Sequence, residues 1–378
     1  MSDVMNDPTE HGGVATVPPP GDPDLLPHIE PLWRIRLRLY RRNFAKNWRL
    51  FRSNPVGMIG LVIIGIFGVM AVAQPILINS NLWASAVYDP VVGVDENLET
   101  RMVVIVDKPE GEVNPLTEIS RRQAIFSGVV GNVGDEVEVF ESHPLPPNRE
   151  HLLGTDPLGR DVLSQLMFGA RAAFALGFIA ALVTVFIATS VGAIAAYYGG
   201  FIDSGFMRLA DLLLMLPILA VLIVVNSVIP DFKVWHLALF LGLLGGFGGT
   251  AIILKSQALA VKVKPYIDAA RVSGGGSRRI IFSHLIPNVM PLSFLYMMFS
   301  VTTAIATEAT LSFFGLLNVE MSWGIMIQLA QSQGYLLSGL TFWWMLFPAG
   351  VAVTLLAAAF YLVGRGMDEI VNPRLRKR

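Results

Sequence analysis

The sequence predicts an all-α polytopic membrane protein, and three observations lead to this prediction. Only 15% of the 378 residues are charged, whereas soluble domains carry about a quarter. Hydrophobic residues make up 53% of the chain, and the mean hydropathy is +0.56. Apolar stretches recur at close to the roughly 20 residues that a helix needs to cross a bilayer. We therefore expect six transmembrane helices, over 56–78, 172–198, 206–229, 236–254, 289–316 and 342–364.

Several classes of chemistry are excluded by composition. The chain has no cysteine, so disulfides, thiol catalysis and Cys-based metal sites are ruled out. Its six histidines form no HxxxH or HExxH pair, and we predict no metal site. A phosphate-binding GxxxxGK[ST] loop is missing from the sequence, and no Ser–His–Asp order stands out. We expect no catalytic residues, and the net charge of −1 gives no reason to expect a nucleic-acid partner.

The segment before the first stretch divides into two parts. Residues 1–30 are polar and proline-rich, which predicts a disordered cytoplasmic tail rather than a signal peptide. Residues 31–55 mix arginines with aromatic and aliphatic side chains directly before the first apolar stretch. This pattern is typical of an amphipathic helix lying on the cytoplasmic lipid surface.

The distribution of Lys and Arg predicts the orientation in the membrane. Twenty of the 28 basic residues fall on alternate connections: 34–52, Arg208, 255–279 and 365–378. Because cytoplasmic loops are enriched in these residues, both ends are expected to be cytoplasmic, including a basic tail at 367–378.

The same orientation places residues 79–150 outside the cell. Two short β-rich runs, at 102–106 and 136–140, flank turn-like residues 128–134. We expect a small, mainly β extracytoplasmic insertion.

Residues 264–288, between the fourth and fifth stretches, are the most informative connection. Pro265 is suited to open a short helix, and three glycines at 274–276 break it. A second short helix should follow, which Pro287 closes or kinks. Such a helix–glycine–helix loop is well shaped to dock into another protein. A surface loop anchored by its arginines to anionic lipid fits the same residues, and both interpretations stay open at this point.

Particular residues of this loop resemble a known motif. Asp268-Ala269-Ala270, Gly274, Ile280 and the Leu-Ile-Pro ending at Pro287 resemble the EAA loop of ABC-importer permeases, with Asp268 where that family usually has Glu. In that family the loop, here about residues 261–290, sits in a groove of the ATPase subunit. The resemblance implies coupling roles for Tyr266, Asp268, Ala269, Ala270, Arg271, Gly274, His284 and Pro287.

Other stretches are similar to C-type dipeptide, oligopeptide and nickel permeases in the same order along the chain. They lie within 45–78 and 150–376, with a permease core expected at 151–366. The resemblance implies a type I importer fold in the bacterial inner membrane. It implies as partners a second homologous permease, two cytoplasmic subunits that bind ATP and Mg, and an extracytoplasmic peptide-binding protein. No cofactor is expected in this chain.

Candidates for the translocation path lie in the fifth stretch. Thr303, Thr307 and Glu308 occupy it, and carboxylates inside the membrane are functional candidates. Glu308 would equally suit capping a neighbouring helix or pairing with Arg160 or Arg171. The expected cargo is a di- or oligopeptide. Nickel or another small solute, a secondary transporter and a membrane scaffold remain alternatives.

Overall fold

The computed structural model describes residues 32–92, 101–105, 136–140, 143–230, 232–317 and 319–371. The expectations for the tail at 1–30, the turn at 128–134 and the end of the basic tail fall outside these ranges. The chain divides into two compact units, Met1–Leu50 and Phe51–Arg378. Within the described part, helices dominate, which confirms the helical membrane class.

Among the described residues, four helices are long and apolar enough to cross a membrane. They are α2 (Pro55–Asn79), α5 (Val162–Tyr198), the continuous run Ser277–Phe313, and α14 (Trp343–Val371), of which Trp343–Asp368 forms the candidate span. Two bent pairs pass the same test together: α6 (Gly200–Met215) with α7 (Ile218–Val228), and α8 (Val234–Phe247) with α9 (Gly249–Lys262). The described residues therefore hold four spans, or up to six if each pair counts as one.

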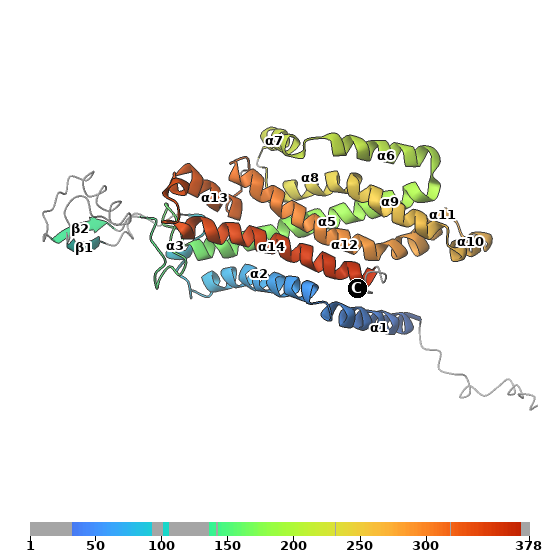
Figure 1. The fold of residues 1–378 in the computed structure, drawn as a ribbon, viewed down its shortest axis with the longest axis horizontal. Helices are drawn as coiled ribbons and strands as arrows, with labels where there is room; N and C mark the ends of the chain where they lie inside the picture. Colours follow the sequence, from blue (N-terminus) through green and yellow to red (C-terminus); the bar gives the residue numbers. More distant parts are fainter. Residues whose placement is uncertain are drawn as a thin grey trace, which may run out of the picture. The chain divides into compact units, whose positions relative to one another are not determined.

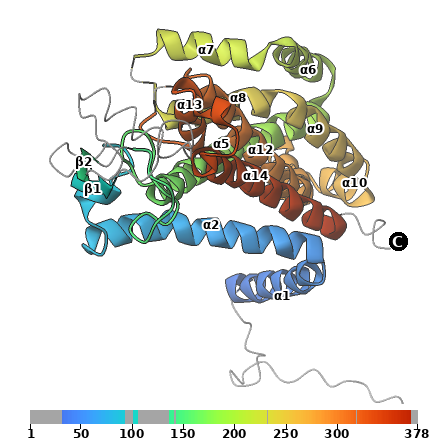
Figure 2. The same ribbon diagram turned by 60° about the vertical axis from the view of Figure 1, so that its left-hand side comes forward.

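The third expected stretch, 206–229, is not a straight helix. Its two halves meet at 86° (Figure 2). Leu216 is extended, with ψ of 130°, and Pro217 follows it. Proline disfavours a helical residue before it and has no N–H for the helix ladder, so the helix breaks there.

The second expected stretch begins ten residues earlier than the sequence indicated, at Val162 instead of 172. Asp161 caps this helix, because its Oδ1 accepts the Ser164 N–H at 2.7 Å. Polar residues in the first turns, such as Gln165, lower the hydropathy there, so a hydropathy pattern places the start of the helix too late. α2 begins in a similar way, with Asn54 accepting the Gly57 N–H at 3.0 Å.

α5 is the central helix of the second unit. It packs against α8, α9 and α12 (Ile286–Phe313), while α14 packs against α2 and α12 (Figure 1). Small residues allow these close approaches. A Cβ on Gly60 of α2 would lie 2.5 Å from the Ala359 carbonyl oxygen of α14, so no larger residue fits without moving a helix.

Short elements complete the fold. α1 (Leu32–Arg52) precedes α2, and α3 (Ser85–Tyr88) follows it. β1 (Arg101–Ile105) and β2 (Glu136–Phe140) pair antiparallel, with Arg101 opposite Phe140. α13 (Trp323–Ser332) and the 3₁₀ turn η4 (Tyr335–Ser338) connect α12 to α14.

Candidate functional site

The loop with the resemblance forms a compact feature, here called the hook, spanning residues 263–285. It consists of α10 (Pro265–Val272), the three glycines, α11 (Ser277–Ile280) and a π-helical turn, η3 (Ile281–Leu285). In Figure 1 the hook lies at one end of the second unit, and α13 lies at the other end.

Buried aliphatic residues hold the hook to the helices that flank it. Ile267, Ile280 and Leu285 are each 0% exposed. They belong to one cluster with Leu254 of α9 and Val289 of α12. Burial of three such side chains makes the base of the hook part of the core, so it cannot move independently of α9 and α12.

The glycines reverse the chain after α10. Gly274 has φ of +80°, a left-handed conformation that suits glycine at a helix end. The Gly275 N–H donates to the Ala270 carbonyl oxygen at 2.9 Å. A Cβ on Gly275 would lie 2.6 Å from that same oxygen, so this position excludes a side chain.

One detail of the expected hook is corrected by the structure. Pro287 neither closes a second short helix nor bends the chain sharply, because Ser277–Phe313 forms one continuous span candidate. The π-helical turn before Pro287 explains this. The Ile286 N–H donates to the Ile281 carbonyl, and the proline, which has no N–H, then stands in the first turn of α12. The short helix that the sequence predicted after the glycines is therefore the beginning of the span candidate Ser277–Phe313.

The outer surface of the hook is apolar and basic. Val272 is 89% exposed and Phe282 63% exposed, and Lys264, Arg278 and Arg279 of the same loop are exposed as well. Exposed apolar side chains rimmed by charges are typical of a protein interaction site. A fixed base and such a surface are what a docking element requires.

The remaining residues implied by the resemblance lie on or beside this surface. Asp268 and Arg271 form an ion pair at 3.3 Å, and both side chains are exposed. The Arg271 guanidinium also lies 5.7 Å from the centre of the Tyr197 ring of α5. Ring centroids of Tyr266 and His284 are 6.4 Å apart. Ala269 is exposed and Ala270 half-buried, so the structure brings the predicted set together on one loop.

The three path candidates on α12 separate into two environments. Thr303 is exposed and Thr307 half-buried, and their hydroxyls donate to the carbonyls of Phe299 and Thr303. Glu308 is instead buried, and its Oε1 accepts the Ser312 hydroxyl at 2.7 Å. Pairing of Glu308 with Arg160 does not occur, because Arg160 binds Asp156.

A second polar cluster, which we call the α5 junction, was matched by sequence resemblance but given no role. It comprises residues 143–165 with Tyr88 and Trp344. The Asp156 carboxylate is its centre, accepting hydrogen bonds from the Leu158 and Arg160 N–H groups, the Arg160 guanidinium and the Gln165 amide, at 2.7–2.9 Å. The turn-forming Asp-Pro-Leu-Gly sequence at 156–159 was the signal that could have found it.

Further bonds of the α5 junction join distant segments. His151 Nδ1 lies 2.9 Å from Asp161 Oδ2, and the Ser164 hydroxyl donates to the Tyr88 carbonyl at 2.6 Å. The Trp344 indole N–H donates to the Thr155 carbonyl at 3.2 Å. Burial, with the nearby carboxylates of Asp161 and Glu150, raises the pKa of the Tyr88 hydroxyl. The junction thus ties α3, the start of α5 and the start of α14 together.

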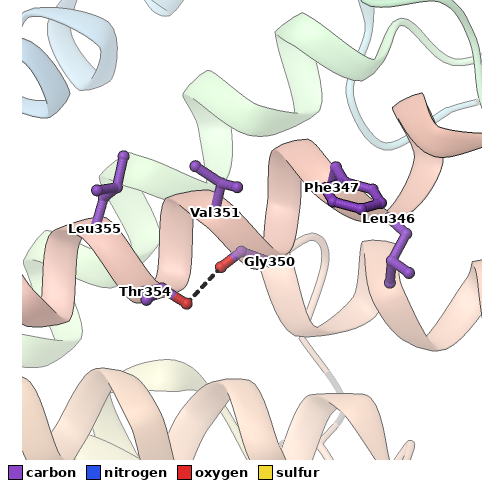
Figure 3. A pocket seen from close by; sticks show the side chains of 6 residues that line it. All are labelled: Leu346, Phe347, Gly350, Val351, Thr354 and Leu355. Carbon is purple, nitrogen blue, oxygen red and sulfur yellow. Dashed lines mark hydrogen bonds between the residues drawn. The ribbon is translucent and has the colours of Figure 1, made fainter.

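A shallow groove of about 410 Å³ runs along α14. Figure 3 shows its lining by Leu346, Phe347, Gly350, Val351, Thr354 and Leu355. The Thr354 hydroxyl donates to the Gly350 carbonyl at 2.8 Å, so the main polar side chain in the groove is bonded within its own helix. The groove suits apolar contact with lipid or another helix. Within the described residues, no group of three His, Asp or Glu side chains is placed to hold a metal.

The fold and the hook define a multi-pass helical membrane protein with an exposed helix–glycine–helix loop between two span candidates. Residues 188–377 match the family of binding-protein-dependent transport system inner membrane components. Residues 36–90 match the N-terminal TM domain of oligopeptide transport permease C. The chain belongs to the binding-protein-dependent transport system inner membrane component family, whose members are the non-catalytic permeases of ABC transporters.

Individual relatives agree with this assignment. The dipeptide transport system permease protein DppC of Bacillus subtilis is 36% identical over 237 residues, which are 62% of this chain and 72% of that protein. The oligopeptide transport system permease protein OppC of the same organism is 35% identical over 238 residues, 61% of this chain and 74% of that protein. OppC of Mycobacterium tuberculosis is 34% identical over 236 residues, 61% of this chain and 78% of that protein.

Proposed function

We propose that this chain is one of two membrane subunits of an ATP-driven importer of di- or oligopeptides in the bacterial inner membrane. The family and the peptide-transport names of several relatives support this function. The complex would contain a second homologous permease, two cytoplasmic ATP-binding subunits and an extracytoplasmic peptide-binding protein.

The observation that supports the proposal most strongly is the combination of a buried base and an exposed surface in the hook. Ile267 and Ile280 lie in the core, whereas Val272 and Phe282 face outward. A protein docked on the exposed surface can therefore push on α9 and α12 directly. Closure of the ATP-binding subunits would move the hook, and α9 and α12 would carry that movement to the path as a rocking of rigid helices.

The proposed topology counts each bent pair as one span, giving six. Both termini and the hook then lie on the cytoplasmic side, in agreement with the Lys and Arg distribution. The segment 79–150, including the β1–β2 pair, lies outside as a small insertion. The hook and the α5 junction occupy opposite ends of the second unit (Figure 1), as this topology requires.

For the path we propose Thr303 and Thr307, which lie on a face of α12 that is exposed at Thr303 and half-buried at Thr307. That face presents threonine and alanine at Thr303, Ala306 and Thr307, whereas the open face of α2 presents aliphatic residues such as Ile59, Val62 and Ile66. A threonine-rich face suits a polar path, and an aliphatic one suits lipid. Glu308 is buried against Ser312, and we assign it to positioning the end of α12.

Affinity purification of the tagged chain in mild detergent tests the proposal, with all co-purifying chains identified by mass spectrometry. Wild type is compared with a Gly274→Asp, Asp268→Arg variant. The matched control is Gly339→Asp, Glu320→Arg, because Gly339 is also left-handed with open space around it and Glu320 is an exposed acid.

We expect wild type and control to recover a second permease and ATP-binding subunits, and the hook variant to retain the permease while losing the ATP-binding subunits. Recovery of the chain alone in every case would overturn the importer function. Uptake of labelled dipeptide and of nickel, in cells lacking their own importers for each, then decides the cargo.

A further inference from the structure

α1 has a charge pattern that the transport function does not explain. Among its 21 residues are eight Arg and Lys side chains and no Asp or Glu. Arg41, Arg42, Lys46 and Arg49 are exposed. Because α1 carries no acidic residue, these exposed charges give the helix a positive field that attracts an anionic partner.

The sequence of α1 separates charge from aromatic residues by helical spacing. At intervals of three or four residues, one face takes the positions of Trp33, Leu37, Tyr40, Phe44, Trp48 and Phe51. The opposite face takes the positions of Arg38, Arg42, Lys46 and Arg49, while Arg34, Arg36, Arg41 and Arg52 take positions that flank the aromatic face. A partner for α1 must therefore offer negative charge and an apolar medium side by side.

The end of α1 lies where a membrane boundary is expected. Phe51 is 8% exposed, and a Cβ on Gly57 of α2 would lie 2.8 Å from its ring. α2 begins at Pro55, and Val56 and Ile59 are already exposed apolar residues. Only Ser53 and Asn54 separate the last residue of α1 from a helix that is apolar enough to cross the bilayer.

We propose that α1 binds the phosphate headgroups of anionic phospholipids and lies in the lipid interface next to the start of α2. Arginine guanidinium groups match phosphate oxygens in pairs, and aromatic rings are favoured at the boundary of headgroups and acyl chains. An acidic protein surface or a nucleic acid would satisfy the arginines but leave the aromatic face in water. This lipid site is independent of which solute the permease carries.

Because the sequence contains no cysteine, a single introduced cysteine can be labelled specifically. The full chain is reconstituted into vesicles of phosphatidylcholine with or without phosphatidylglycerol, carrying either Tyr40→Cys or Ala45→Cys with an environment-sensitive fluorophore. Quenching by lipids spin-labelled near the top of the acyl chain reports insertion. We expect strong quenching at position 40 only with phosphatidylglycerol, reversal by high salt, and weaker quenching at position 45, which the helical spacing places on the basic face.

A charge variant supplies the second measurement. Four substitutions in the Tyr40→Cys background remove four positive charges from α1: Arg38→Gln, Arg41→Gln, Arg42→Gln and Arg49→Gln. Each positive charge near an anionic surface strengthens membrane binding about fivefold. Removing four charges should therefore reduce quenching to the level seen in phosphatidylcholine alone. The control replaces four exposed basic residues outside α1 and the hook, Arg149, Arg208, Lys233 and Arg365, by Gln; it removes equal charge and should leave quenching unchanged.

Two outcomes would overturn this proposal. One is equal quenching at position 40 in neutral and anionic vesicles, which would leave no role for the arginines. The other is a label that stays water-exposed in both lipids and becomes shielded only when ATP-binding subunits are added, which would assign the helix to a protein partner. Either result leaves the hook experiment untouched.

Discussion

Two Asp–Arg pairs of nearly identical sequence spacing lie at opposite ends of the second unit and have opposite characters. In the α5 junction, Asp156 and Arg160 are 2.7 Å apart, with side chains 6% and 8% exposed. In the hook, Asp268 and Arg271 are 3.3 Å apart, with side chains 64% and 43% exposed. The buried pair belongs to a hydrogen-bond network, whereas the exposed pair faces solvent and has only the Tyr197 ring beside its arginine. Burial, and not the residue types, decides which pair stabilises the fold and which is free to meet a partner.

The largest expected effect comes from breaking the buried pair. Asp156→Ala leaves the Arg160 guanidinium buried without its carboxylate, which costs about 3–5 kcal/mol of unfolding free energy. Asp268→Ala should cost less than about 1 kcal/mol because solvent already screens that pair. Thermal unfolding of both variants in detergent measures the difference. Equal shifts in the two melting temperatures would contradict the contrast between the regions.

The second prediction separates the base of the hook from its surface. Ile267→Ala removes a fully buried side chain and should lower stability by roughly 2–5 kcal/mol. Val272→Ala, at an 89% exposed position, should change stability by less than about 0.5 kcal/mol while weakening recovery of the ATP-binding subunits. Melting temperature and co-purification are measured on the same samples. A stable Ile267→Ala protein would show that the base is not fixed.

The third prediction concerns the glycines between α10 and α11. Gly275→Ala places a Cβ against the Ala270 carbonyl oxygen and should cost about 1–3 kcal/mol. Gly276→Ala is the matched change, because this residue has φ of −66° and open space around it. It should be neutral or slightly stabilising. Similar losses in both variants would mean that general backbone freedom, and not one close approach, matters here.

The smallest expected effect tests the α5 junction through pH. Burial and nearby carboxylates raise the pKa of Tyr88 in the folded chain above its usual value near 10. Above pH 10 the unfolded tyrosine loses its proton first, so the folded state binds more protons and stability falls with rising pH. Tyr88→Phe should remove part of this alkaline decline. Melting curves of both proteins at neutral and alkaline pH measure it, and parallel declines would contradict the assignment.

Much of the candidate site was predictable from the sequence, because its elements depend on local chemistry. Pro265 opens α10 and Gly274 ends it, as the spacing indicated. Pro287 was misjudged because a π-helical turn lets the chain continue, and hydropathy carries no sign of such a turn. The burial of Glu308 could not be predicted from the sequence either, because it depends on which face of α12 the other helices cover.

The sequence by itself determined that this chain is a helical membrane protein with an EAA-like loop, because apolar length, basic-residue distribution and turn residues act over short distances. Only the tertiary structure decided that 206–229 bends by 86°, and that one Asp–Arg pair is a buried junction while the other is exposed. The physical reason is that burial is a property of packing between distant segments. Two Asp–Arg pairs of similar local spacing therefore acquire different energies.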